Sequence, residues 1–362
     1  MACSRRDVMT HNNVNAWPLV KHLHTPQPAI FWTDLLSSAL VGWGSFALAL
    51  FARPFSLWMW LGILGASCGL YRGLCFVHEI SHMRRSYLRG FETAWNLLFG
   101  VPLLMPSFVY VGVHSNHHSL ATYGTAQDPE YLPFARSHWM SIVFVAHSVL
   151  IPLVLLIRFL VVAPAGLLWP RLHDWLVEHA SSLSMNTLYR RENSGQLTAW
   201  IRRWEISILV AAVAAVLVSR HYGVGWKAVA IWYTISACAA VINALRALGA
   251  HRYESDGTPL DRGGQLLDSI DTPGAVWTEL WAPVGLRYHA LHHYFPGIPY
   301  HNLGKAYRQL VSGLPAEAAY QDLTSPSLPW SLRRLYRTGR LAVREKQSGK
   351  VYAQPPLRSP GN

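Results

Sequence analysis

The sequence predicts an all-α polytopic membrane protein with about four main transmembrane helices in two hairpins, supplemented by interfacial helices. Of its 362 residues, 51% are hydrophobic and 14% are charged, whereas a soluble domain carries about 25% charged residues. The mean hydropathy is positive, at +0.16. Several predominantly apolar runs approach or exceed the length of about 20 residues that a helix needs to span a bilayer.

The formal net charge of +12 raises the question of nucleic-acid binding. No basic cluster interleaves with the signature of a nucleic-acid fold, and the arginines lie mainly beside apolar runs. Lys and Arg beside spans are typical of cytoplasmic loops. We therefore expect the lipid bilayer, and no nucleic acid, as a partner. The four cysteines have no paired spacing and predict no disulfide framework.

The first hairpin follows a polar N-terminal arm, residues 1–29, which we expect to be mobile. Residues 30–51 and 55–77 are two apolar runs of bilayer length, joined by a short turn at Arg53-Pro54. Because a hairpin returns the chain to its starting side, the N-terminus and His78 should lie on the same side of the membrane.

Two further apolar segments lie between the hairpins. Residues 93–113 contain two prolines, and a crossing here would put His114 on the opposite side from His78. We therefore expect an interfacial or partly buried helix that returns to the same face. Residues 140–169 are too long for one simple span. They should cross the membrane either twice or not at all, because the histidines before and after them are expected on the same side.

The second hairpin comprises residues 204–219, a short span, and residues 224–248, a full one. Two crossings return the chain to the His78 side at His251. The membrane domain is thus predicted to cover residues 30–310. Residues 311–362 form a C-terminal segment without a span, whose Pro/Arg-rich end we expect to be disordered.

Three histidine clusters stand out among the 18 histidines. The first, HEISH, places two imidazoles at i and i+4 on one helix face, and the pattern HxxHH then occurs twice, as HSNHH and HALHH. Converging imidazoles without a nearby thiol suit iron, zinc or copper. Their number is too large for one such ion and suits two. The clustered histidines are His78, His82, His114, His117, His118, His289, His292 and His293.

Two residues near these clusters allow two interpretations each. His251 emerges from the last span on the same side, and is either a ninth ligand or a structural histidine. Glu79 is either an acceptor that fixes a histidine tautomer or a helix-surface charge. Only Glu79 and His82 show the Glu-x-x-His spacing that ferritin-like di-iron bundles use twice, so that arrangement is disfavoured.

HEISH, HSNHH and HALHH, in this order and flanked by membrane hairpins, resemble the three histidine boxes of the membrane fatty acid desaturase/hydroxylase superfamily over roughly residues 30–310. The resemblance implies four main transmembrane helices, a cytosolic histidine-rich cap and a centre of two non-haem irons that uses O₂. It implies that the eight clustered histidines are metal ligands, and His251 matches the further ligand after the last span.

The boxes also indicate a subgroup. The HxxxH first box resembles that of acyl-lipid desaturases, and the third box begins with His289, where front-end desaturases usually carry Gln. The chain has no HPGG segment of a fused cytochrome b5. The resemblance thus implies a bacterial-type enzyme that receives electrons from a separate ferredoxin or a cytochrome b5-like protein with its reductase.

The predicted function is O₂-dependent desaturation of a fatty acyl or acyl-like chain. A hydroxylase, a ketolase or a desaturase of a non-acyl metabolite stays open, because product choice depends on fine placement of one C–H bond. A metal transporter is disfavoured, because transport sites lie near the bilayer midplane whereas the boxes flank the spans. Arg84, Arg85 and Arg89 after the first box predict that the boxes and both termini are cytoplasmic. For the bacterial type that the resemblance implies, the membrane would be the inner or plasma membrane of the cell.

Overall fold

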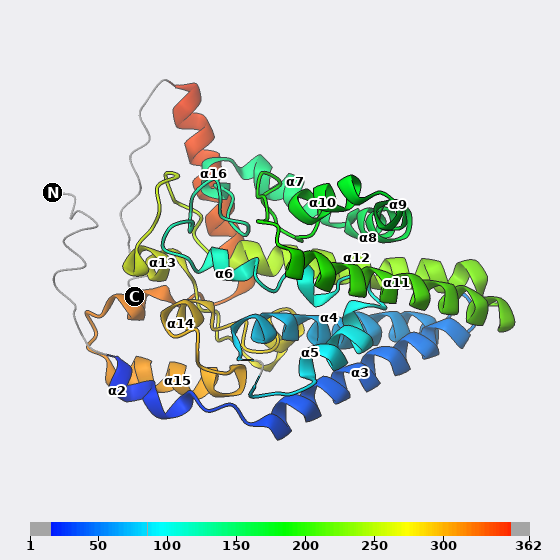
Figure 1. Ribbon diagram of the computed structural model, residues 1–362. Helices are drawn as coiled ribbons and strands as arrows, with labels where there is room; N and C mark the ends of the chain where they lie inside the picture. Colours follow the sequence, from blue (N-terminus) through cyan, green and yellow to red (C-terminus); the bar gives the residue numbers. More distant parts are fainter. Residues whose placement is uncertain (1–15, 85, 349–362) are drawn as a thin grey trace.

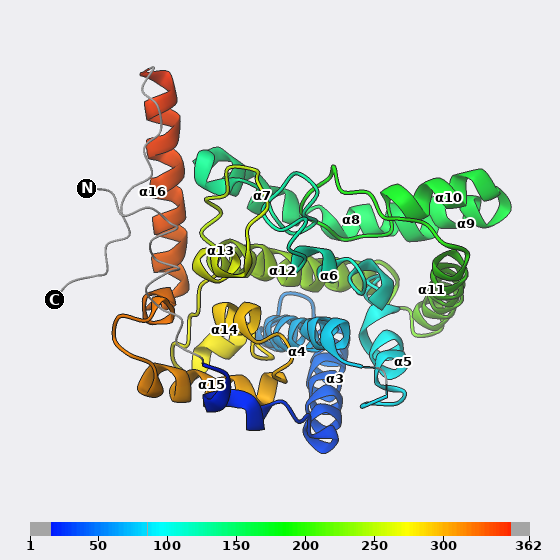
Figure 2. The same cartoon turned by 60° about the vertical axis from the view of Figure 1, so that its left-hand side comes forward.

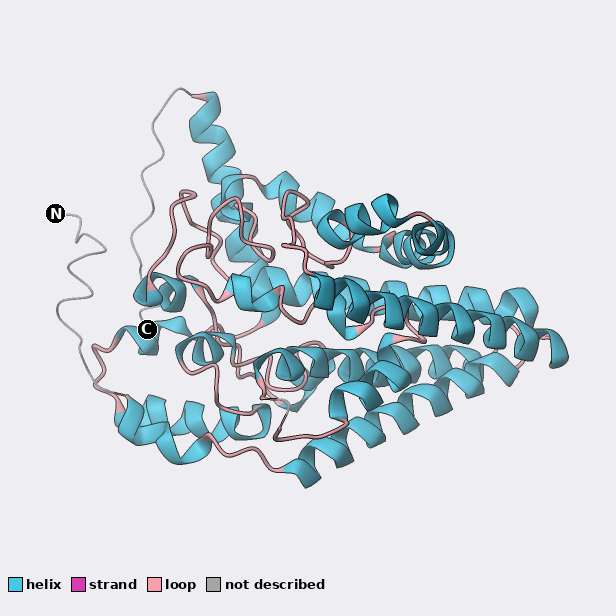
Figure 3. Ribbon diagram, in the orientation of Figure 1, coloured by secondary structure: helices cyan, strands magenta, loops and turns pink. Residues whose placement is uncertain are grey.

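The computed structural model describes residues 16–84 and 86–348. Within these residues every regular element is a helix, and the only β-type pairings are isolated bridges (Figure 3). The all-α prediction is therefore confirmed. The expected disordered tail lies mostly in residues 349–362, outside the described part of the chain.

The first predicted hairpin consists of α3 (Pro28–Phe51) and α4 (Leu57–His82). Pro28 begins α3 at a position where its missing N–H costs nothing, and the Ser56 hydroxyl caps α4 by accepting from the Met59 N–H at 3.3 Å. α4 ends five residues later than the predicted span, so that both histidines of the first box lie in its last turns.

The second hairpin consists of α11 (Gly195–His221) and α12 (Gly225–Ala250). Gly223 provides the positive φ of 65° that the connecting turn requires. α12 packs against both α3 and α4, and the hairpins lie side by side (Figure 1). At the turn end, the Lys227 ammonium donates to the Ala52 carbonyl at 2.5 Å.

Four helical segments of the described residues are long and apolar enough to cross a membrane. Three match the predicted spans, but the segment 204–219 is not among the four. Those 16 residues are shorter than a bilayer span, and α11 extends them with a polar first part. The four segments are Pro28–Phe51, Leu57–His82, Ile151–Leu168 and Gly225–Ala250.

Residues 93–113 do not form the single helix that we predicted. They are divided among α5 (Phe91–Trp95), the π-helical turn η2 (Asn96–Gly100) and the 3-10 turn η3 (Ser107–Val109), because the prolines break the backbone ladder between them. The predicted return is nevertheless observed, since α6 (His114–His117) lies beside the end of α4.

The long apolar run 140–169 is divided into several helices that lie across α12 from the first hairpin (Figures 1 and 2). Its third part is π-helical, and Arg158 from this part is buried against Glu205 of α11 at 2.7 Å. The helices of this layer are α7 (His138–Ser148), α8 (Ile151–Leu156), η5 (Ile157–Val162), α9 (Ala163–Leu168) and α10 (Pro170–His179).

The C-terminal elements, together with short elements of the N-terminal arm and of residues 134–136, form a cap at the end of the bundle where α4 and α12 finish (Figure 1). α2 packs on α15 and Val20 is fully buried, so the described part of the N-terminal arm is attached to this cap. The elements are α2 (Trp17–Val20), η1 (Lys21–Leu23), η4 (Phe134–Arg136), α13 (Arg262–Asp268), η6 (Val276–Leu280), α14 (His289–Tyr294), α15 (Tyr300–Gly313), η7 (Ala319–Leu323) and α16 (Leu328–Gln347).

Candidate metal centre

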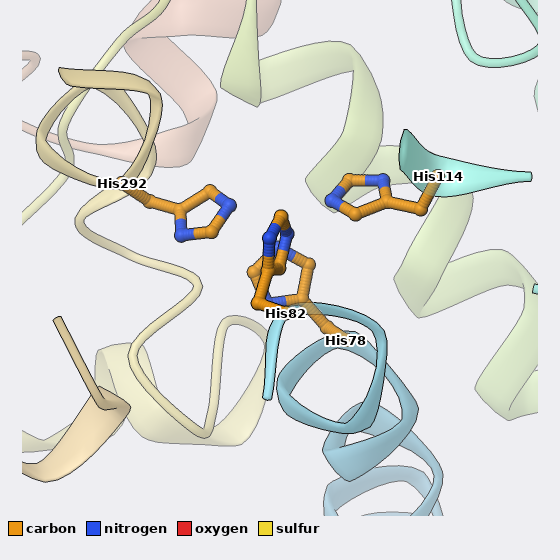
Figure 4. A group of neighbouring side chains, drawn as sticks. All are labelled: His78, His82, His114 and His292. Atoms are coloured by element: carbon orange, nitrogen blue, oxygen red, sulfur yellow. The ribbon is translucent and has the colours of Figure 1, made fainter. Parts of the chain in front are cut away.

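Two groups of four histidines lie side by side where the cap meets the ends of α4 and α12. Within each group the ligand nitrogens lie within 4.8 Å of one another. The first group is His78, His82, His114 and His292, which point toward a common centre (Figure 4). The second group is His117, His251, His289 and His293.

The second and third histidine boxes each contribute to both groups, whereas the first box contributes to the first group only. The last two turns of α4 provide His78 and His82, whose i, i+4 spacing puts both on one face. α6 contributes His114 to the first group and His117 to the second, and α14 contributes His292 to the first group and His289 and His293 to the second. The chain bends into α6 at Gly112, which has a φ of +80°. The buried guanidinium of Arg191 donates to the Val111 carbonyl at 2.8 Å and so fixes that bend.

His118 belongs to neither group of four and lies between them. Its Nε2 is 3.0 Å from Nε2 of His114 and 3.2 Å from Nε2 of His292, while its ring stacks on that of His293 with centroids 4.3 Å apart. His251 is placed at the end of α12 with its Nε2 2.8 Å from Nε2 of His289. The structure therefore brings all nine predicted histidines into one cluster.

The nitrogen spacings fit two metal ions. Metal–imidazole bonds of about 2.0–2.1 Å put two nitrogens at right angles about 3 Å apart, and the closest pairs here are 2.8 to 3.2 Å apart. The Nε2 atoms of His78, His82 and His117 are buried without a hydrogen-bond partner. Such atoms are costly unless something binds them. The residues present thus fit two metal ions with all-nitrogen ligands.

Carboxylates that the sequence analysis did not assign hold several of these rings. Glu130 Oε1 lies 2.6 Å from Nδ1 of His114, and Asp128 Oδ1 lies 3.0 Å from Nδ1 of His117. The Tyr123 hydroxyl, which donates to Asp268 at 3.1 Å, lies 2.9 Å from Nδ1 of His251. A carboxylate that accepts the Nδ1 proton directs Nε2 toward a metal.

The sequence offered only an indirect signal for these partners. Asp128 and Glu130 follow the second box closely in a chain with 19 acidic residues. No fixed spacing links either carboxylate to a box.

Burial and neighbouring charges shape the protonation of the cluster. Burial holds the pKa of His114 and of His292 well below the ordinary value of 6.5, because it disfavours the charged imidazole. For His117 burial also lowers the pKa, but the nearby carboxylates, chiefly Asp128, together outweigh it and the pKa is raised. Neutral imidazole is the form that binds a metal, so most of the cluster is ready to bind at neutral pH.

Glu79 has the buried position of a supporting residue. Only 4% of it is exposed, and its carboxylate accepts from the Tyr300 N–H at 3.0 Å. The helix-surface interpretation is therefore wrong. Nδ1 of His78 and Oε1 of Glu79 are 3.6 Å apart, too far for a hydrogen bond. The main hydrogen bond of Glu79 therefore attaches α4 to α15 instead of fixing a histidine tautomer.

Comparison with known proteins identifies the family. A model of the fatty acid desaturase family matches residues 54–324, which contain all nine histidines. The chain is also 38% identical over 338 residues to a ceramide hydroxylase of Caulobacter vibrioides, which covers 92% of this chain and 94% of that protein. With its four apolar helices the chain is an integral membrane protein. It is therefore a member of the fatty acid desaturase family, and an oxidoreductase of the desaturase–hydroxylase kind.

Proposed function

We propose that this protein is an O₂-dependent hydroxylase that converts one C–H bond of a ceramide-type lipid into an alcohol. The observation that carries the proposal is the near-full-length similarity to a ceramide hydroxylase, combined with two histidine groups that fit two metal ions. Two non-haem irons, when bound, would supply activation of O₂ and removal of hydrogen from an unactivated C–H bond.

The chain's own residues contribute ligand geometry and exclusion of water. Asp128 and Glu130 hold the rings of His117 and His114, so that the Nε2 atoms of both face the inside of the cluster. His114, His117 and His292 are at most 2% exposed, which protects a reactive oxidant from solvent.

Desaturation of an acyl chain, the activity predicted first from the sequence, is the second candidate. Both reactions begin with removal of one hydrogen atom, and they diverge according to whether a second C–H bond or the oxygen lies closer to the resulting centre. The similarity to a hydroxylase favours oxygen insertion.

We further propose that electrons come from a separate ferredoxin or cytochrome b5-like protein, and that the cluster and both termini face the cytoplasm. Arg84 and Arg89, just beyond the end of α4, support this orientation. Reduction by either donor in a reconstituted assay, and protease accessibility of the cluster side in inverted vesicles, would test the two statements.

The decisive experiment supplies ceramide and isotopically labelled O₂ to membranes from a host that expresses the protein. A hydroxylase yields a product that contains one labelled oxygen, whereas a desaturase yields a product with two fewer hydrogens and no label. The His117→Ala variant should give neither product and should contain less iron. His221→Ala, an exposed histidine at the end of α11, is the matched control and should behave as wild type.

A further inference from the structure

A positive charge lies inside the bundle close to the metal centre. Arg246 belongs to α12, within a segment long and apolar enough to cross the membrane. Its Nη2 and Nε donate to Oδ1 of Asn243 at 3.1 and 3.3 Å. Among the described residues no carboxylate forms an ion pair with it. Charged residues in such segments are rare and usually functional.

The direction in which Asn243 and Arg246 point follows from a third residue of α12. Trp232 donates from its indole nitrogen to the Pro102 carbonyl at 2.9 Å, so its face of α12 looks toward the segment between η2 and η3. Asn243 is 243 − 232 = 11 residues later, about three helical turns, and Arg246 is 246 − 232 = 14, about four. Both therefore lie on the face of α12 that carries Trp232.

The facing side of α4 continues directly into the metal centre. Tyr71, Cys75, His78 and His82 are spaced i, i+4, i+7 and i+11, so that they form one stripe along the helix. Arg246 interacts electrostatically with Tyr71 and Cys75. Since α4 rises about 1.5 Å per residue, Cys75 lies only about 4–5 Å along the axis from His78.

The charge also reaches the second-box side of the centre. Arg246 interacts electrostatically with Glu130, whose Oε1 lies 2.6 Å from Nδ1 of His114. The guanidinium thus lies among α4, α12 and the second box, on the membrane side of the cluster.

The guanidinium has hydrogen-bonding capacity to spare. It carries five N–H donors. Two of them are used by Asn243, and Tyr71 is a further hydrogen-bond partner. Asn243 is exposed and Arg246 is partly exposed, so a ligand can reach both side chains. A hydrocarbon chain next to them would leave the remaining N–H donors of the guanidinium without an acceptor, which is unfavourable. A lipid with a carbonyl or hydroxyl oxygen would supply one.

We propose that Arg246, oriented by Asn243, hydrogen-bonds the amide carbonyl or a hydroxyl group of the lipid substrate, and so determines which C–H bond faces the metal centre. Arg246 is then a specificity-determining residue that requires a polar group near the site of oxidation. This inference rests on the proposed action on a ceramide-type lipid. It adds the hydrogen bond by which Arg246 would select that lipid.

The test compares Arg246→Met with wild type on ceramide and on a free fatty acid of the same chain length, with metal content measured in both proteins. We expect kcat/KM for ceramide to fall about ten- to a hundredfold, the range for a hydrogen bond to a charged group. This fall should come mainly from a higher KM. The hydroxyl group of the product should spread over neighbouring carbons, and metal content should stay at the wild-type value. Asn243→Ala should cause a smaller change in the same direction. Arg220→Met, an exposed arginine at the end of α11, is the matched control and should change nothing.

Several outcomes would overturn the proposal. An equal loss on both lipids or a loss of metal would make Arg246 a structural counter-charge for Glu130, and a larger loss on the fatty acid would make it a carboxylate site. If wild type leaves ceramide unchanged, the proposed function fails separately. Native mass spectrometry of ceramide binding then decides, with weaker binding to Arg246→Met supporting the contact and equal binding refuting it.

Discussion

Both carboxylate oxygens of Asp128 lie within hydrogen-bond distance of Nδ1 of His117, at 3.0 and 3.1 Å. The carboxylate is held in turn by the backbone N–H groups of Gly124 and Glu130, each at 2.9 Å. Neither Asp128 nor His117 is more than 1% exposed. The orientation of one ligand ring is thereby fixed by a short loop that directly follows the second box.

Replacing Asp128 with Asn should weaken metal binding about ten- to a hundredfold, because the ring of His117 loses its anionic acceptor. Iron content after dialysis against a graded series of chelator concentrations measures the effect. Asp174→Asn, at an exposed position of α10, serves as the control. Equal iron retention in the Asp128 and Asp174 variants would show that the carboxylate does not support the site.

Replacing His251 with Ala should empty one metal position and leave the other. His251 contributes to the second group only, with its Nε2 2.8 Å from that of His289. The metal content should therefore fall from two ions per chain to about one. Elemental analysis of the purified protein checks this, with His147→Ala on the exposed side of α7 as the control. Loss of both ions would mean that the two groups bind as one unit.

The metal-free protein should lose stability as the pH falls below about 6.5. Burial lowers the pKa of six clustered histidines that lie outside the membrane-spanning helices, so the unfolded chain takes up protons before the folded one. The stabilisation is complete only above the pKa of the unfolded state. His117 acts in the opposite sense, because its raised pKa stabilises the fold below about 6.5 and the effect is lost as the pH rises. The six are His114, His118, His251, His289, His292 and His293.

Thermal unfolding of the metal-free protein in detergent, between about pH 7.5 and about pH 5, measures this balance. The midpoint temperature should fall on acidification, and more steeply in wild type than in a variant with His292 replaced by Gln. A flat profile would indicate that the cluster opens to solvent when no metal is bound.

Replacing Glu205 with Gln should destabilise the protein by about 3–5 kcal/mol, the usual cost of breaking a buried ion pair. Glu205 is fully buried, and its two oxygens contact Arg158 at 2.7 Å and His173 at 3.1 Å. Glu178→Gln, at an exposed position of α10, should change the midpoint little. Similar midpoints for both variants would show that the Arg158 charge finds another partner.

The sequence by itself determined the features that depend on local spacing. The apolar runs predicted three of the four segments that are long and apolar enough to cross a membrane, and the i, i+4 spacing of His78 and His82 put both on one face of α4. Counting crossings also placed His114 beside His78, because each crossing changes the side of the membrane. These assignments depended on the length of each apolar run. The run 204–219 is short, which explains why it is not among the four candidate spans.

The tertiary structure decided which histidines share a metal position. His114 joins the first group and His117 the second, although the two are three residues apart. It also supplied Asp128, Glu130 and Asp268 as partners of the ligand rings, and it broke residues 93–113 into short turns. Each of these features arises from packing between segments distant in the chain or from irregular backbone. Helical periodicity carries no information about either, because it describes only neighbours on the same helix.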